Sequence, residues 1–222
     1  MTKYKGITLF FLFGLSLLFL IAGCRIGEIP LSENHLKLSE YNIIWESPSK
    51  DHHGSMPVGN GDIGLNVWVE ENGDISFYIG KTDSWGDNGR LLKIGKVRVQ
   101  CEPAIIFPDA EFRQELNLTT GTILIGSTGI IQNKPVDIAL ELWVDANNPV
   151  IHLSYESSIP LSMTATIELW RTEPESLPFI GIGDLLEVRS KHDHLSEPVI
   201  VEPDHIIEKS EGYIGWYHHN HK

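Results

Sequence analysis

The sequence predicts an all-β protein, an antiparallel β-sandwich that follows a lipoprotein signal peptide. Short runs of alternating apolar and polar residues recur from about residue 41 onward, and Gly, Pro and Asn separate them at regular intervals. No amphipathic helical pattern lies between these runs, so consecutive strands are expected to pair with each other. The chain is long enough for one sandwich-sized core and short for two full domains, so we expect one domain.

The clearest local prediction is a β-hairpin near the start of this region. Residues 64–69 and 75–79 alternate in the manner of half-buried strands, and residues 71–74 (Glu-Asn-Gly-Asp) lie between them. An Asn-Gly pair flanked by alternating apolar residues is a strong hairpin signal, because both residues tolerate positive φ angles.

Further strands are expected wherever the same alternation returns between turn residues. They are residues 96–101, 112–117, 122–127, 135–144, 150–157 and 162–169. The Pro- and Gly-rich stretch 171–184 interrupts the pattern and is expected to be a long loop. After it come two weaker strand-like runs, residues 198–201 and 213–217.

The first 24 residues have the order of a signal peptide: a basic start, an apolar run over residues 7–20 and an exit with small residues. The run is shorter than the roughly 20 residues of a membrane span. The exit Ile21-Ala22-Gly23-Cys24 resembles the bacterial lipobox, in which the Cys is acylated and becomes the new N-terminus. We therefore expect a signal peptide (1–23), a tether (24–40) and a β-sandwich domain (41–222). The protein would be exported and membrane-anchored, either periplasmic or at the cell surface.

Charge and cysteine content restrict the partners. The net charge is −13 and the pI about 5.1, which disfavours nucleic acid and anionic membrane surfaces as ligands. Once Cys24 carries lipid, Cys101 has no disulfide partner, and its place at the end of an alternating run predicts a buried strand thiol. Nothing in the sequence indicates a cofactor.

Two segments are too particular for ordinary sandwich loops. The first, residues 54–64, holds four glycines, so its backbone must turn tightly, and Asn60 and Asp62 would project from it. The second contains Asp83 and Trp85. Each aspartate either serves a site or caps a local turn. Trp85 either stacks on a sugar ring or plugs the space beneath a loop.

Two other motifs could suggest a dinucleotide site and a zinc site, but their sequence context does not fit either. The first segment spells Gly-x-Gly-x-x-Gly, but a dinucleotide site needs a strand before that motif and a helix after it, whereas here a strand is expected to follow. Three groups of histidines could supply zinc ligands, namely His52-His53, His192-x-His194 and His218-His219-x-His221. They lack cysteine partners and metal-helix spacing, so we predict no metal site.

The motif Met56-Pro57-Val58-Gly59-Asn60-Gly61-Asp62-Ile63-Gly64, with Trp45 before it and Thr82-Asp83-Ser84-Trp85 after it, resembles the N-terminal β-sandwich domain of glycoside hydrolases related to family 95, the α-L-fucosidase group. It is more similar still to an uncharacterised bacterial domain family that precedes such catalytic regions. The resemblance implies a super-sandwich followed by an (α/α)6 barrel that carries the catalytic carboxylate. The sequence ends at Lys222, where such relatives continue, so no catalytic residue is carried over.

These observations predict an accessory, non-catalytic domain of a carbohydrate-active lipoprotein, truncated or separated from its barrel. Its partners would be the membrane, through the lipid on Cys24, a carbohydrate ligand, and an (α/α)6 catalytic domain or separate chain. Asn60, Asp62, Asp83 and Trp85 would lie in loops that face the ligand or the barrel. The alternative is a stand-alone carbohydrate-binding surface lipoprotein. A third is an independent hydrolase that uses the loop acids.

Overall fold

The computed structural model describes residues 37–86, 91–177, 199–210 and 213–220. Residues from Leu38 onward belong to one compact unit. The predicted signal peptide, the lipidation site at Cys24 and nearly all of the predicted tether lie outside the described residues, as do His192, His194 and His221. Among the residues that are described, no helical segment has the length and hydrophobicity that a transmembrane span requires.

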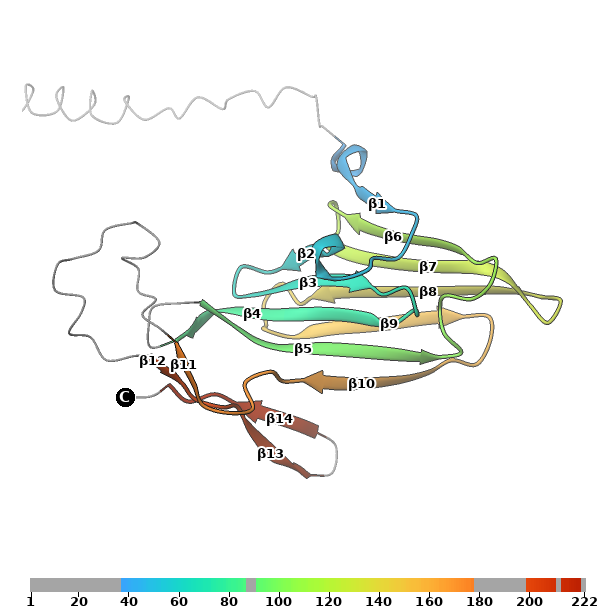
Figure 1. Cartoon of the computed structure of the whole chain (residues 1–222). Helices are drawn as coiled ribbons and strands as arrows, with labels where there is room; N and C mark the ends of the chain where they lie inside the picture. Colours follow the sequence, from blue (N-terminus) through green and yellow to red (C-terminus); the bar gives the residue numbers. More distant parts are fainter. Residues whose placement is uncertain (1–36, 87–90, 178–198, 211–212, 221–222) are drawn as a thin grey trace, which may run out of the picture. The chain divides into compact units, whose positions relative to one another are not determined.

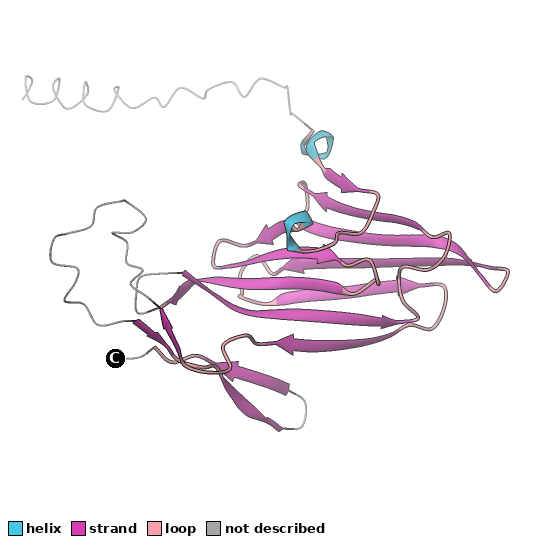
Figure 2. Cartoon of the chain, in the orientation of Figure 1, coloured by secondary structure: helices cyan, strands magenta, loops and turns pink. Residues whose placement is uncertain are grey.

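The unit is all-β, as the sequence predicts (Figure 2). Two short 3-10 helices near its start are η1 (Leu38–Tyr41) and η2 (His52–Gly54). The strands of the two large sheets are β1 (Ile43–Trp45), β2 (Met56–Gly59), β3 (Ile63–Val69), β4 (Ile75–Trp85), β5 (Leu91–Glu102), β6 (Glu111–Asn117), β7 (Thr122–Ile131), β8 (Lys134–Val144), β9 (Ile151–Ser157) and β10 (Ser162–Glu168). The shorter ones after them are β11 (Glu175–Leu177), β12 (Val199–Val201), β13 (His205–Ser210) and β14 (Tyr213–Tyr217).

Two five-stranded sheets form the sandwich (Figure 1). The first sheet has the order β1-β6-β7-β8-β9, and the second has the order β10-β5-β4-β3-β2. Every pair of neighbouring strands in them is antiparallel. The strand pairs β11-β12 and β13-β14 form two small sheets of their own.

The core lies between the two sheets and takes alternate side chains from each. Val67 and Ile75 from the second sheet and Ile123, Ile138 and Leu142 from the first are completely removed from solvent. Burying one such aliphatic side chain contributes about 1.5–3 kcal/mol, so these strands are held mainly by their inward-facing residues. A buried hydrogen bond also joins the sheets, from Gln114 Nε2 to the carbonyl oxygen of Val67 at 3.2 Å.

Most predicted strands are confirmed, with their ends shifted. The hairpin β3-β4 turns at Gly73, whose φ of 89° suits glycine. Strands β4 and β5 continue several residues beyond the predicted ranges, so that Trp85 pairs with Leu91. Strand β2 was not predicted as a strand, because it lies inside the glycine-rich motif. The stretch 171–184 was expected to be a loop, but its described part contains β11.

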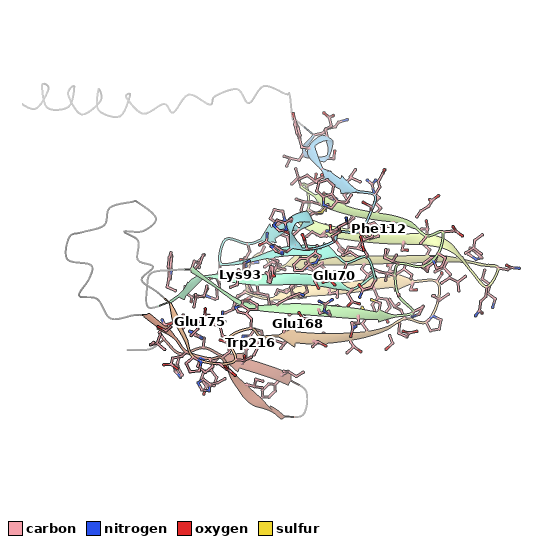
Figure 3. The ribbon with its side chains drawn as sticks, in the orientation of Figure 1. Glu70, Lys93, Phe112, Glu168, Glu175 and Trp216 are labelled. Atoms are coloured by element: carbon pink, nitrogen blue, oxygen red, sulfur yellow. The ribbon has the colours of Figure 1, made fainter. Side chains whose placement is uncertain are left out.

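The hairpin β13-β14 is fixed to the second sheet by polar contacts, one of them from Trp216 (labelled in Figure 3). Trp216 donates from Nε1 to the carbonyl oxygen of Ile94 in β5 at 2.8 Å. Arg171 also donates to that carbonyl and to the carbonyl of Lys93, while its Nε lies 2.8 Å from Oδ1 of the buried Asp204. The end of the described chain therefore packs on β5.

Candidate functional site

The loop acids Asp62 and Asp83 meet at a shared lysine. Lys81 in β4 donates from Nζ to Asp62 Oδ1 at 3.1 Å and to Asp83 Oδ2 at 2.7 Å. Thr82 donates a second hydrogen bond to Asp62 Oδ1, from Oγ1 at 3.1 Å. We call these four residues the charged cluster. The sequence named its two acids but not the lysine that joins them.

Hydrogen bonding sets the charge states in this cluster. The bonds to Asp83 and Asp62 raise the pKa of Lys81, and the bond from Lys81 lowers the pKa of Asp83. Asp83 therefore remains ionised at neutral pH. Hydrolysis of a glycosidic bond requires one of its two carboxyl groups to be protonated as a general acid, and a lowered pKa works against that role.

Asn60 has a structural role in this geometry. Its Oδ1 accepts from the backbone N–H groups of Asp62 and Ile63, both at 2.9 Å, which closes the turn between β2 and β3. Its Nδ2 donates to the carbonyl oxygens of Asp145 and Asn148, beyond the end of β8. The turn capping that the sequence offered as an alternative for Asp62 is thus performed by Asn60, which also ties this end of the two sheets together.

Trp85 stands at the end of β4 and is 53% exposed. Its Nε1 donates to the carbonyl oxygen of Thr82 at 2.8 Å, and its cross-strand partner Leu91 is also exposed. Trp85 is therefore not a core plug. The ring and Leu91 form an exposed apolar pair beside the charged cluster.

A groove of about 590 Å³ runs across the outer face of the second sheet, next to this cluster. Register places Gly59, Gly64, Gly80 and Lys93 side by side on β2, β3, β4 and β5, so a row without side chains ends at a lysine. One wall is the neighbouring row Pro57, Asn66 and Tyr78. The opposite wall includes Asp62 and Thr82.

Aromatic rings lie next to this groove, on the same outer face of the second sheet. Trp68 is only 3% exposed although it points away from the core, because the rings of Tyr78 and His52 and the ammonium of Lys96 pack over it. The exposed Trp170 meets Tyr78 edge to face, with ring centroids 6.0 Å apart. The aromatic residues near the groove therefore support one another.

A charged network lies along the same face (Figure 3 labels Glu70 and Glu168). Arg98 Nη1 donates to Glu70 at 2.7 Å and to Asp74 at 2.9 Å, and Arg98 Nε donates to Glu168. Burial raises the pKa of Glu70, but hydrogen bonds from Arg98 and Ser76 outweigh it and leave the pKa below its ordinary value. The sequence did not predict this network, because strand pairing and the hairpin turn bring its residues together.

The described histidines differ in their contacts and in their potential as metal ligands. His53 Nδ1 lies 2.8 Å from Asp51 Oδ1, and with the adjacent His52 they form a group of exposed potential metal ligands among the described residues. Asp51 already accepts the backbone N–H of His53, which closes the turn and lowers the Asp51 pKa. His218 contacts Asp204 at 3.0 Å. The prediction of no metal site stays a prediction.

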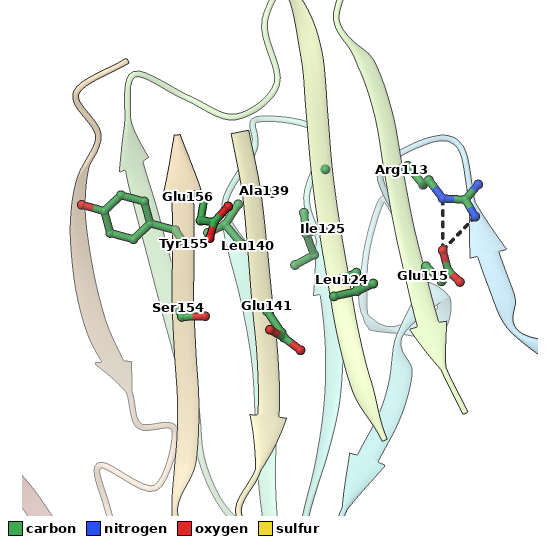
Figure 4. A pocket seen from close by; sticks show the side chains of 11 residues that line it. Arg113, Glu115, Leu124, Ile125, Ala139, Leu140, Glu141, Ser154, Tyr155 and Glu156 are labelled. Atoms are coloured by element: carbon green, nitrogen blue, oxygen red, sulfur yellow. Dashed lines mark hydrogen bonds and ion pairs between the residues drawn. The ribbon is translucent and has the colours of Figure 1, made fainter. Parts of the chain in front are cut away.

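The outer face of the first sheet has a smaller hollow, of about 410 Å³ (Figure 4). Gly126 and its cross-strand neighbour Ala139 lie in it, and Glu141 and the ion pair Arg113–Glu115 line it. This hollow is an alternative ligand site to the groove on the second sheet. Cys101 belongs to neither: it is buried, and burial, followed by the charge of Asp74, raises its thiol pKa to about 11.

Comparison with known proteins places the domain in a family. No curated protein matches the sequence. A sequence model described as "Domain of unknown function (DUF5703)", for the N-terminal part of that domain, matches residues 44–222. The expected membership of an uncharacterised domain family is thereby confirmed, whereas the link to glycoside hydrolases stays a prediction. The match covers well over half of the sequence, and the chain therefore belongs to the DUF5703 N-terminal domain family.

Proposed function

We propose that this chain is an accessory, non-catalytic β-sandwich domain of a carbohydrate-active lipoprotein and that it binds carbohydrate beside the charged cluster. The observation that carries the proposal is the combination of an exposed aromatic ring, Trp85, with the hydrogen-bonding groups of Asp62, Thr82 and Asp83 on one rim of the sandwich. An aromatic ring offers apolar area and the neighbouring groups fix orientation, which is how proteins hold small polar ligands.

The lipid anchor is the other part of the proposal. The lipobox-like Ile21-Ala22-Gly23-Cys24 would attach the mature protein to a membrane, with the tether predicted over residues 24–40 as the link to the domain. Each buried methylene of an acyl chain contributes about 0.8 kcal/mol, so two or three chains give stable anchoring. Carbohydrate would then be captured close to the membrane.

A direct binding assay tests the carbohydrate-binding part. The full chain, purified in detergent, is run through native gels containing one polysaccharide at a time, and retardation is compared with a gel without polysaccharide. We expect retardation by at least one polysaccharide, and weaker retardation of the Trp85→Ser variant. Unchanged mobility of the wild type in every gel would contradict carbohydrate binding.

An activity assay tests the non-catalytic part. Because the enzymes that the sequence resembles carry their catalytic carboxylate in a separate (α/α)6 barrel, we expect no turnover of aryl fucosides, galactosides or arabinosides by this chain. A rate that disappears in the Asp83→Asn variant would show instead that the chain is a hydrolase.

The exposed pair of Trp85 and Leu91 favours a second candidate role, which is contact with a catalytic domain. In that case an (α/α)6 domain, on the same chain or a separate one, would cover this rim. The coding sequence that follows Lys222 distinguishes a partner domain from a stand-alone binding protein.

A further inference from the structure

We infer that the groove over Gly64 and Gly80 is the ligand site and that it takes a sugar ring of a neutral saccharide lying directly on the strand backbones. The inference rests on the proposed carbohydrate-binding function and adds its location and ligand class.

Local structure does not require two of the three glycines in the row. A Cβ on Gly59 would lie 2.6 Å from the carbonyl oxygen of Ile63, so the tight turn demands glycine there. A Cβ on Gly64 would meet nothing within 4 Å, and one on Gly80 only the oxygen of Gly64 at 3.9 Å. Neither residue has a positive φ angle. The bulge beside Gly80 inserts its extra residue, Ile94, in β5 rather than β4.

Where no such local reason applies, a glycine within a strand lowers stability; Gly80 lies in the middle of β4, and Gly64 is the second residue of β3. Such a glycine destabilises the strand by roughly 0.5–1 kcal/mol relative to alanine, and it often marks a place where a ligand approaches the backbone. Gly64 and Gly80 are cross-strand partners, so together they leave one continuous bare floor. The side chains on either side start about 13 Å apart along the strands, at 3.3 Å per residue over four residues. A pyranose ring in its chair form is small enough to lie on such a floor.

The walls supply both hydrogen-bond donors and acceptors. Within the part of the chain that the structure describes, the Asn66 amide, the Tyr78 hydroxyl and the Lys93 ammonium have no hydrogen-bond partner, and all three residues line the groove. Lys93 Nζ lies 4.1 Å from the centre of the Tyr78 ring (Figure 3 labels Lys93). Hydroxyl groups around a sugar ring can satisfy all three. A purely apolar ligand would desolvate them without replacement, at a cost for each.

Charge selects a neutral saccharide over an acidic one. Lys81 is occupied by two carboxylates, whereas Lys93 has no carboxylate partner among the described residues. The groove is lined by Lys81, Lys93 and Asp62, and Asp83 lies just outside it, bonded to Lys81. The two lysines and the two aspartates together carry no net charge. The net charge of −13 on the whole chain further opposes a polyanion.

Filling the floor tests the location. In Gly64→Leu the new side chain occupies the groove without a backbone clash, so we expect the variant to fold and to bind neutral polysaccharide at least tenfold more weakly than wild type. The matched control is Gly126→Leu, because Gly126 is also a strand glycine with open space above it, but in the hollow of the first sheet. The control should bind as wild type does. Folding of both is checked by urea denaturation.

The probes are xyloglucan, arabinogalactan and galactomannan as neutral polysaccharides and polygalacturonate as the acidic one, each tested with the full chain in detergent.

Should Gly64→Leu fail to fold, Asn66→Ala tests the same site without added bulk. We expect this variant to bind about tenfold more weakly, as for the loss of one hydrogen bond. Undiminished binding by a folded Gly64→Leu variant and by Asn66→Ala, or loss only in Gly126→Leu, would overturn the location and leave the proposed function standing. Binding of polygalacturonate alone would overturn the ligand class. No binding by the wild type to any probe would contradict the proposed function itself.

Discussion

Two tryptophans on the second sheet show how the surroundings of a residue decide its role. Trp68 and Trp85 both lie on strands of that sheet, yet Trp68 is 3% exposed and Trp85 is 53% exposed. Trp68 is covered by neighbouring rings and by Lys96, whereas Trp85 ends its strand beside Leu91. The first therefore contributes to stability, and the second is available to a ligand or partner.

Replacing each tryptophan by serine should separate these roles. We expect Trp85→Ser to change the free energy of unfolding by about 0.5 kcal/mol or less, because surface substitutions seldom cost more. Trp68→Ser, the matched control, should cost roughly 3–5 kcal/mol, the usual range for truncating a buried aromatic. Urea denaturation measures both. A large loss in Trp85→Ser would mean that its ring is buried in solution.

Arg98 is the residue on which the charged network of the second sheet depends. Its side chain is mostly buried and it contacts Glu70, Asp74 and Glu168. Removing one partner from a buried ionic network leaves charges without compensation, which usually costs 3–5 kcal/mol. An exposed pair such as Arg113–Glu115 contributes about 1 kcal/mol or less.

We therefore expect Arg98→Met to lower the free energy of unfolding by about 3 kcal/mol at pH 7, and Arg113→Met by no more than about 1 kcal/mol. The pKa of Glu70 and of Glu168 is below the ordinary 4.5, so each carboxylate stabilises the folded state above that pH and stops doing so as the pH falls through its folded pKa. The penalty of Arg98→Met should shrink below about pH 4.5. A penalty that is equal at pH 7 and pH 3 would be evidence against this network.

At the scale of elements, strand β5 joins three parts of the fold. It pairs with β4 and β10, and the hairpin β13-β14 is anchored on it through Trp216. Gly95 makes that contact possible, because a Cβ there would lie 2.7 Å from Cζ2 of the Trp216 ring. The glycine in this strand is therefore required by packing, unlike Gly64 and Gly80.

Gly95→Ala should displace the hairpin. We expect a loss of roughly 1–3 kcal/mol in stability from the clash with the rigid indole, together with faster proteolysis within residues 205–217. Gly80→Ala is the control, since its Cβ enters open space, and it should be neutral or slightly stabilising. Equal protease resistance of Gly95→Ala and wild type would show that the hairpin does not depend on this contact.

At the scale of the whole molecule, the proposal depends on the lipid at Cys24. Acylation of this residue prepares a lipoprotein precursor for cleavage, so Cys24→Ala should accumulate as an unlipidated precursor with its signal peptide intact. Labelled fatty acid should enter the wild-type chain and the Cys101→Ala control, but not the Cys24→Ala variant. Equal incorporation into wild type and Cys24→Ala would exclude this anchor.

Strand alternation explains why much of the fold could be predicted. Because side chains in a strand alternate with a period of two residues, the sequence shows which of them face inward. The hairpins β3-β4 and β7-β8 also have short turns containing Asn or Gly, which mark where each strand ends. Strand β2 and the ends of β4 and β5 escaped prediction because glycines and polar residues break the alternation there. These segments contribute to the groove and the charged cluster, and two further strands, β1 and β13, were not predicted either.

The sequence by itself determined the fold class, most strands, the buried thiol of Cys101 and the two segments that carry the candidate residues. Only the tertiary structure decided what those residues do. Asn60 closes a turn, Asp62 and Asp83 share Lys81, and Gly64 meets Gly80 across two strands. The physical reason is that alternation assigns each residue to a face, whereas neighbours on that face are set by strand order and register. Strand order and register depend on how the two sheets pack against each other around their shared core.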